Sequence, residues 1–96
     1  MTSCLSDTLV QQLQDLAARS GASRLVLFGS RARGDYHRSS DIDLAVWGGN
    51  IPRFALDIDE ETSTLLKYDV VDMGQDVSAG LLDAVQREGR ILYEKV

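Results

Sequence analysis

The stretch that decides the fold runs from Gly29 to Leu44 and reads GSRARGDYHRSSDIDL. It follows the apolar run Leu25–Phe28 and includes the beginning of a second run, Ile42–Trp47, and these runs predict two short strands. Gly29 ends the first run, and because it has no Cβ it allows a sharp turn and the close approach of a ligand to the backbone. The sequence therefore predicts two strands joined by a polar loop over residues 29–40.

Outside this unit the chain alternates between helical and strand patterns. Leucines at helical spacing predict an amphipathic helix over residues 7–20, with Ser6 or Asp7 as its N-cap and Gly21 as its stop. The order αββαβα(β) predicts a small α/β (α+β) sandwich, with a mixed sheet backed by helices in a single domain over residues 1–96. The remaining expected elements are a helix from Pro52 to about Leu66, a strand over Asp69–Met73, a helix that starts after a cap at Asp76 or Ser78 and ends at Gly89, and an edge strand over Ile91–Tyr93.

The composition is that of an ordinary globular domain. The chain has 96 residues, of which 44% are hydrophobic and 26% charged. No run of 18 apolar residues is present and the N-terminal residues do not resemble a signal peptide, so we expect a cytoplasmic protein with no membrane contact. Cys4 is the single cysteine, which excludes an internal disulfide and, with a single His, argues against a structural zinc site.

The charge is unevenly distributed along the chain. The net charge is −5, yet residues 24–40 carry a net charge of +3 and residues 41–76 a net charge of −7. An acidic protein binds a nucleic acid backbone poorly, so direct binding of nucleic acid is not expected. A basic loop followed at once by carboxylates instead suits a phosphate compound together with a divalent metal ion.

The basic loop carries candidate phosphate-binding groups. Ser30 offers a backbone N–H and a hydroxyl beside Arg31 and Arg33, and these donors could hold the terminal phosphates of a nucleotide. The loop is not a Walker A motif, because Gly-Lys-Ser/Thr is missing, and its two glycines do not make a dinucleotide-binding fingerprint.

The acidic part carries candidate metal ligands. Asp41 and Asp43 stand two residues apart at the start of a strand, so their side chains point to the same face and could bind two divalent ions. If the third strand pairs next to this one, Asp69 can complete the site as a metal ligand or as a base for an incoming hydroxyl. Side chains alternate between the two faces of a strand, so Asp72 lies on the face opposite to Asp69 and is the weaker candidate.

Gly29-Ser30, ten intervening residues and Asp41-Ile42-Asp43 together resemble the motif of the DNA polymerase β-like nucleotidyltransferase superfamily. The short chain is similar to the minimal nucleotidyltransferase branch, and Tyr68–Asp72 is similar to the strand that carries that branch's third acid, here Asp69. The resemblance implies the polymerase β-like fold. It also implies that the Gly-Ser pair binds nucleotide phosphates, that the three Asp bind two Mg²⁺ ions, and that AMP passes from ATP to a hydroxyl group.

The resemblance also implies a partner. Small members of this branch are typically paired with a HEPN-domain toxin and act as antitoxins that adenylylate a tyrosine of that toxin. Two alternatives stay open at this point. The chain could be a non-catalytic antitoxin that neutralises its partner by occlusion, which the acidic residues 57–61 favour, or it could transfer a nucleotide to a small-molecule hydroxyl.

Overall fold

The computed structural model describes residues 5–95, so Cys4 lies outside the described residues. Within them, no helix has the length and apolar character needed to span a membrane. The elements, in chain order, are α1 (Asp7–Ser20), β1 (Arg24–Phe28), α2 (Ser30–Arg33), β2 (Ile42–Trp47), α3 (Ile51–Glu61), β3 (Tyr68–Asp72), α4 (Ala79–Glu88) and β4 (Arg90–Glu94).

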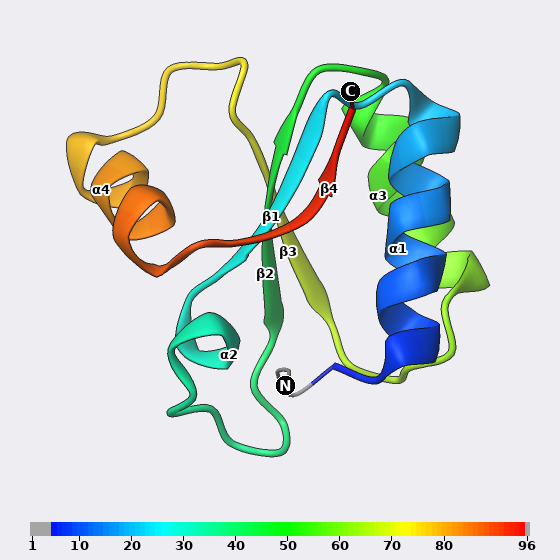
Figure 1. Cartoon of the computed structure of the whole chain (residues 1–96), viewed down its shortest axis with the longest axis horizontal. Helices are drawn as coiled ribbons and strands as arrows, with labels where there is room; N and C mark the ends of the chain where they lie inside the picture. Colours follow the sequence, from blue (N-terminus) through cyan, green and yellow to red (C-terminus); the bar gives the residue numbers. More distant parts are fainter. Residues whose placement is uncertain (1–4, 96) are drawn as a thin grey trace.

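The four strands form one mixed sheet in the order β3-β2-β1-β4. β1 lies antiparallel to both β2 and β4, whereas β2 and β3 run parallel and are connected through α3. The predicted mixed sheet backed by helices is thus confirmed (Figure 1). The parallel pairing places the beginnings of β2 and β3 side by side.

One face of the sheet is covered by α1 and α3 (Figure 1). The apolar stripe of α1 packs with alternate residues of β1 and β2, such as Leu27 and Leu44, to form the larger core. α1 begins where the hydroxyl of Ser6 accepts a hydrogen bond from the Leu9 N–H, and it ends at Gly21 with φ 84°.

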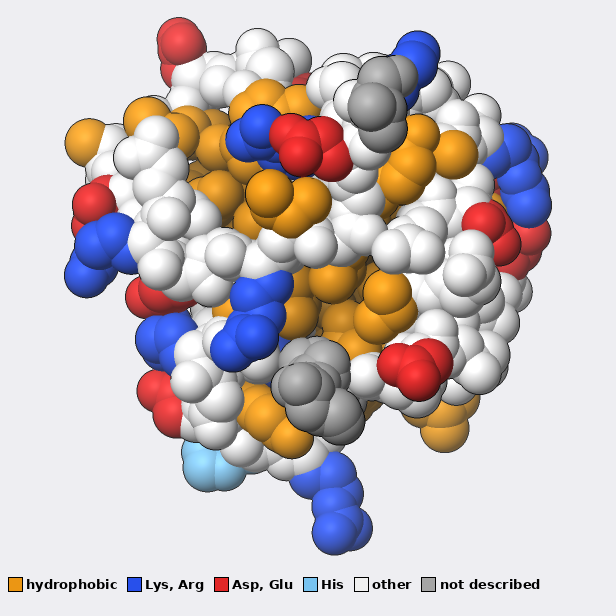
Figure 2. All heavy atoms as spheres, viewed as in Figure 1, with side chains coloured by type: hydrophobic (Ala, Val, Ile, Leu, Met, Phe, Trp, Pro, Cys, Tyr) orange, Lys and Arg blue, Asp and Glu red, His pale blue; other side chains and the backbone are white. Residues whose placement is uncertain are grey.

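The opposite face of the sheet is covered less completely, by α4. Val85 of α4 packs with Val26 and Phe28 of β1 and with Ala45 of β2 in a smaller core. Beside it a groove of about 380 Å³ remains between α4 and the Arg24 end of the sheet. Figure 2 shows apolar side chains reaching the surface in this region.

Several elements differ from the sequence-based expectation. The loop over residues 29–40 contains a single helical turn, α2. The helix expected from Pro52 to about Leu66 begins one residue earlier, capped by the side chain of Asn50, and ends at Glu61. The expected extension to Leu66 is wrong because Thr62 is extended, and Leu65 is fully exposed rather than facing the core.

Candidate functional site

Gly29 joins β1 to α2 in a conformation that suits glycine alone. Its φ of 79° and ψ of −159° lie outside the regions that L-residues occupy easily. A Cβ built on Gly29 would overlap the carboxylate of Asp43, which comes from the neighbouring strand β2. The absence of a side chain at Gly29 therefore lets the Asp43 carboxylate lie directly against the turn.

The structure places the three candidate aspartates at one end of two neighbouring strands. Asp43 and Asp69 are register partners on the parallel strands β2 and β3. Both belong to the face of the sheet that α4 covers, since their strand neighbours Ala45 and Val71 contribute to the smaller core. Asp41 is two residues before Asp43, just outside β2, and is exposed to solvent.

The charges of neighbouring side chains act on the carboxylate of Asp43. Burial raises the pKa of Asp43 above its usual value, and the negative charges of Asp69 and Asp41 raise this pKa further. The positive charge of Arg33 acts in the opposite direction on the pKa of Asp43. A bound cation would relieve the repulsion among these groups.

The donor set fits a hard divalent cation such as Mg²⁺, because all three groups are carboxylates. They do not form a closed cage, however. Across residues 5–95, no three Asp, Glu, His or Cys side chains lie close enough together to hold one metal ion. The backbone fixes the shared face and the register of Asp43 and Asp69, while the carboxylates would have to turn about their side-chain torsions to converge on a cation.

Ser30 is the first residue of α2 and lies half-buried beside this acidic face. The turn is held by its own backbone. The carbonyl of Gly29 accepts hydrogen bonds from the N–H groups of Ala32 and Arg33, and the carbonyl of Ser30 accepts one from the N–H of Gly34. Of the predicted phosphate-binding residues, Gly29 thus lies against Asp43 in space, and Ser30 follows it directly in the turn.

Arg31 has a different environment from the one its sequence position suggests. Its side chain is buried, and its guanidinium donates hydrogen bonds to the carbonyls of Ser40 at 2.9 Å and Arg38 at 3.1 Å. It also lies over the ring of Tyr36, 4.9 Å from the ring centre. These contacts favour a role in shaping the loop over residues 35–40 rather than the predicted contact with phosphate.

Arg33 is the exposed arginine of the turn. Its guanidinium donates to Asp35 at 3.3 Å and to Glu88, at the end of α4, at 3.1 Å. The hydrogen bonds that Arg33 donates, first to Asp35 and then to Glu88, raise the pKa of Arg33, so it stays positively charged. Since its charge also acts on Asp43, Arg33 is the arginine whose position suits the predicted phosphate contact.

Sequence reasoning missed the residues at the α4–β4 junction. Glu88 contacts Arg33, and Nε of Arg90 donates to the carbonyl of Ala32 at 3.0 Å. These pairs are separated by more than 50 positions in the chain, so no local pattern could have indicated them.

Asp72, the weaker candidate for the site, caps a turn instead, because its carboxylate accepts a hydrogen bond from the Gly74 N–H.

The chain is similar to known proteins in sequence and in fold. Residues 11–96 match the family model described as "Polymerase beta, Nucleotidyltransferase". The chain is 39% identical over 84 residues to "Putative protein adenylyltransferase MJ0604" of Methanocaldococcus jannaschii, an alignment that covers 78% of this chain and 82% of the relative.

Solved structures show the same fold. A chain from a toxin–antitoxin complex with AMP-PNP superposes with a TM-score of 0.73 at 24% identity, covering 90% of this chain and 73% of that one. A chain from a mutant of the toxin–antitoxin complex MntA–HpeT superposes with a TM-score of 0.72 at 22% identity, again covering 90% and 73%.

Proposed function

Since the chain belongs to the polymerase β nucleotidyltransferase family, we propose that it transfers AMP from ATP to a hydroxyl group on a partner protein. The observation that carries this proposal is the juxtaposition of Asp43 and Asp69 on neighbouring strands beside the Gly29-Ser30 turn. Phosphoryl transfer depends chiefly on positioning and on neutralising charge, and this end of the sheet provides anionic ligands beside phosphate-binding donors.

Asp41, Asp43 and Asp69 are the residues that would hold two Mg²⁺ ions. Such ions, when bound, neutralise the charge of the triphosphate and stabilise the attacking and leaving oxygens. The raised pKa of Asp43, caused first by burial and then by the charges of Asp69 and Asp41, supports the assignment, because it reflects a carboxylate that gains from a nearby cation.

The protein groups then have separate tasks in the transfer. The amide and hydroxyl of Ser30 and the guanidinium of Arg33 hold the triphosphate tail. The acceptor oxygen attacks the α-phosphorus, the bond from this phosphorus to the bridging oxygen breaks, and pyrophosphate leaves. The proton of the acceptor hydroxyl passes to the carboxylate of Asp69, which lies exposed at the start of β3.

For the acceptor we propose a tyrosine of a HEPN-domain toxin. Support comes from the relative named a protein adenylyltransferase and from the folds shared with chains of toxin–antitoxin complexes. The thin core and the exposed site also fit an acceptor supplied by a partner protein.

The test is transfer of label from α-³²P-ATP to the co-purified partner in the presence of Mg²⁺. We expect the variant with Asp41→Asn and Asp43→Asn to fold normally and to lose transfer by at least about a hundredfold. Asp72→Asn is the matched control, because this carboxylate belongs to β3 but serves the following turn, and it should keep full transfer. Undiminished labelling by the double variant would refute the proposal.

The alternative of occlusion without catalysis loses part of its support. The acidic stretch 57–61 suggested a partner surface, but Asp57 is buried and paired with Arg53 at 3.2 Å, and Glu61 is paired with Arg19. The same double variant separates the two functions. If the protein acts by occlusion, the double variant would still neutralise an equimolar amount of toxin. If it acts by catalysis, the double variant would not.

A further inference from the structure

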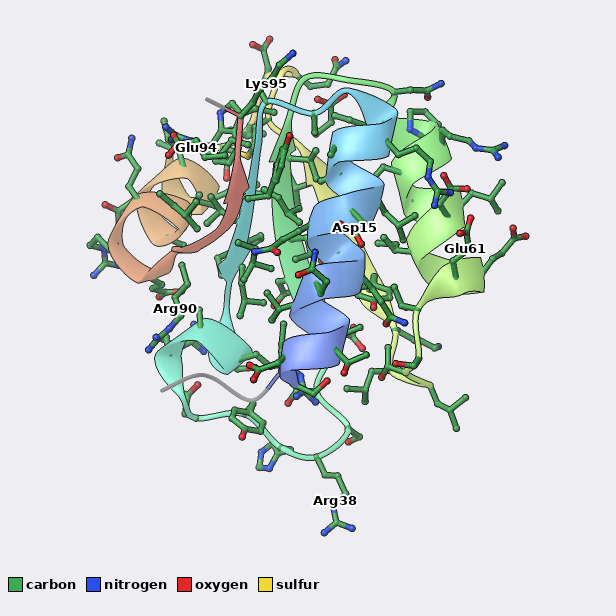
Figure 3. The ribbon with its side chains drawn as sticks, turned by 45° about the vertical axis from the view of Figure 1, so that its right-hand side comes forward. Asp15, Arg38, Glu61, Arg90, Glu94 and Lys95 are labelled. Carbon is green, nitrogen blue, oxygen red and sulfur yellow. The ribbon has the colours of Figure 1, made fainter. Side chains whose placement is uncertain are left out.

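The helical turn α2, which follows Gly29, is contacted by the junction between α4 and β4, residues 88–90. Two contacts join them: Glu88 Oε1 accepts from Arg33 Nη1 at 3.1 Å, and Arg90 Nε donates to the Ala32 carbonyl at 3.0 Å. In Figure 3 Arg90 lies beside α2. The turn is therefore held by residues about 55 positions later in the chain, in addition to its own backbone.

The path of the junction is fixed by close packing. Gly89 crosses β1 so closely that a Cβ at this position would overlap the Val85 carbonyl and the side chain of Val26. The Gly89 N–H also donates to the Val85 carbonyl and so ends α4. Because glycine permits this crossing, Glu88 and Arg90 emerge on either side of it within reach of α2.

Glu88 is the less exposed of the two carboxylates that contact Arg33. The side chain of Glu88 is 18% exposed, compared with 65% for Asp35, the other carboxylate that Arg33 contacts. An exposed arginine has considerable rotamer freedom, and ordering it at the moment of ligand binding costs entropy. With Nη1 held by Glu88 and Nε by Asp35, the guanidinium is already fixed in place before a ligand arrives.

We propose that Glu88 is a positioning residue for the nucleotide: it holds Arg33 beside the Asp43 carboxylate, so that the guanidinium meets the triphosphate without first being ordered. Arg90 supports the same turn through the Ala32 carbonyl. This inference rests on the proposed function and deepens it, since it assigns to the α4–β4 junction a part in binding the triphosphate of the substrate.

The test measures the dissociation constant of Mg²⁺-ATP by isothermal titration calorimetry. We expect Glu88→Gln to weaken binding about threefold to tenfold, as for a charge pair that is partly shielded from solvent. Arg33→Gln should weaken binding at least as much, and adding Glu88→Gln to it should cause no further loss, because Glu88 acts through Arg33. Arg87→Gln is the matched control and should bind Mg²⁺-ATP like the wild type. Arg87 is on the same helix, and among the contacts described for α4 it is paired only with Asp83.

Additive effects of the two substitutions, or a Glu88→Gln variant that binds as tightly as the wild type or more tightly, would overturn the inference. If Glu88→Gln melts at a lower temperature than the Arg87→Gln control, a second variant, Glu88→Asp, separates the loss of charge from the loss of stability. Glu88→Asp keeps the charge, so it should bind Mg²⁺-ATP with an affinity closer to that of the wild type than Glu88→Gln does. Failure of the wild type to bind Mg²⁺-ATP would overturn the proposed function as well, whereas binding that is insensitive to Glu88 would overturn this inference alone.

Discussion

At Gly29 the backbone conformation and the neighbouring carboxylate impose separate demands on the residue. A side chain there would have to adopt φ 79° and would also collide with Asp43. We expect Gly29→Ala to lower the free energy of unfolding by about 1–3 kcal/mol and to displace the Asp43 carboxylate, thereby weakening Mg²⁺-ATP binding.

Gly34 provides the control for this substitution. It has φ 98°, but a Cβ at this position meets no atom within 4 Å. Gly34→Ala should therefore lose stability through backbone strain while nucleotide affinity stays unchanged. Denaturant titration and calorimetry measure the two quantities, and an equal loss of affinity in both variants would contradict the assigned role of Gly29.

Asp43 should lower stability at neutral pH when no divalent ion is present. Burial, followed by the charges of Asp69 and Asp41, raises its pKa in the folded state. The stabilising contribution of protonated Asp43 is therefore fully present below the pKa that Asp43 has in the unfolded chain. It is lost as the pH rises through the pKa that Asp43 has in the folded state. We expect Asp43→Asn to be more stable than the wild type at pH 7 by up to about 1 kcal/mol.

The pH dependence distinguishes this effect from a change in packing. The stability difference between Asp43→Asn and the wild type should disappear at a pH low enough to protonate Asp43 in both folded and unfolded chains. Urea unfolding with a chelator present, repeated over a range of acidic to neutral pH, measures it. A variant that is less stable than the wild type at pH 7 would show that the carboxylate is satisfied without a cation.

Among the elements, the loop over residues 35–40 depends on one buried side chain. The buried Arg31 side chain donates to the loop's carbonyls and lies over Tyr36, so removing the guanidinium leaves these carbonyls without their donor. Arg31→Met should cost about 2–4 kcal/mol of stability and increase amide exchange in this loop. Arg38, which extends into solvent from the tip of the loop in Figure 3, is the control, and Arg38→Met should change neither quantity by more than about 0.5 kcal/mol.

Local signals were sufficient to predict elements whose ends are determined by nearby residues. Ser6 and Gly21 mark the two ends of α1, and Ser78 caps α4. All three are positions that the sequence indicates. The end of α3 was missed because apolar residues continue at helical spacing to Leu66, although Thr62 already leaves the helix. The turn α2 was missed because four residues are too few to produce a period.

At the scale of the whole molecule, the candidate site depends on pairing between distant segments. The sequence predicts that Asp41 and Asp43 share a face, because this follows from the period of a single strand. The position of Asp69 depends on the register of β3 against β2, and the contact of Arg33 with Glu88 depends on how α4 crosses the sheet. Such long-range geometry has no local signature, which is also why the buried position of Arg31 could not be foreseen.

The acidic end of the sheet should make the stability of the whole chain depend on divalent cations. The protein carries a net charge of −5, and the repelling carboxylates lie where β2 and β3 begin. At a Mg²⁺ concentration ten times the dissociation constant, binding to the folded state alone adds about 1.4 kcal/mol, or about 5–10 °C in melting temperature for a chain of this size. The variant with Asp41→Asn and Asp43→Asn should show only the small shift that NaCl of equal ionic strength produces, because screening remains while the ligands are gone. Differential scanning calorimetry across a MgCl₂ titration measures this, and an identical Mg²⁺ response in the two proteins would place the cation elsewhere on the acidic surface.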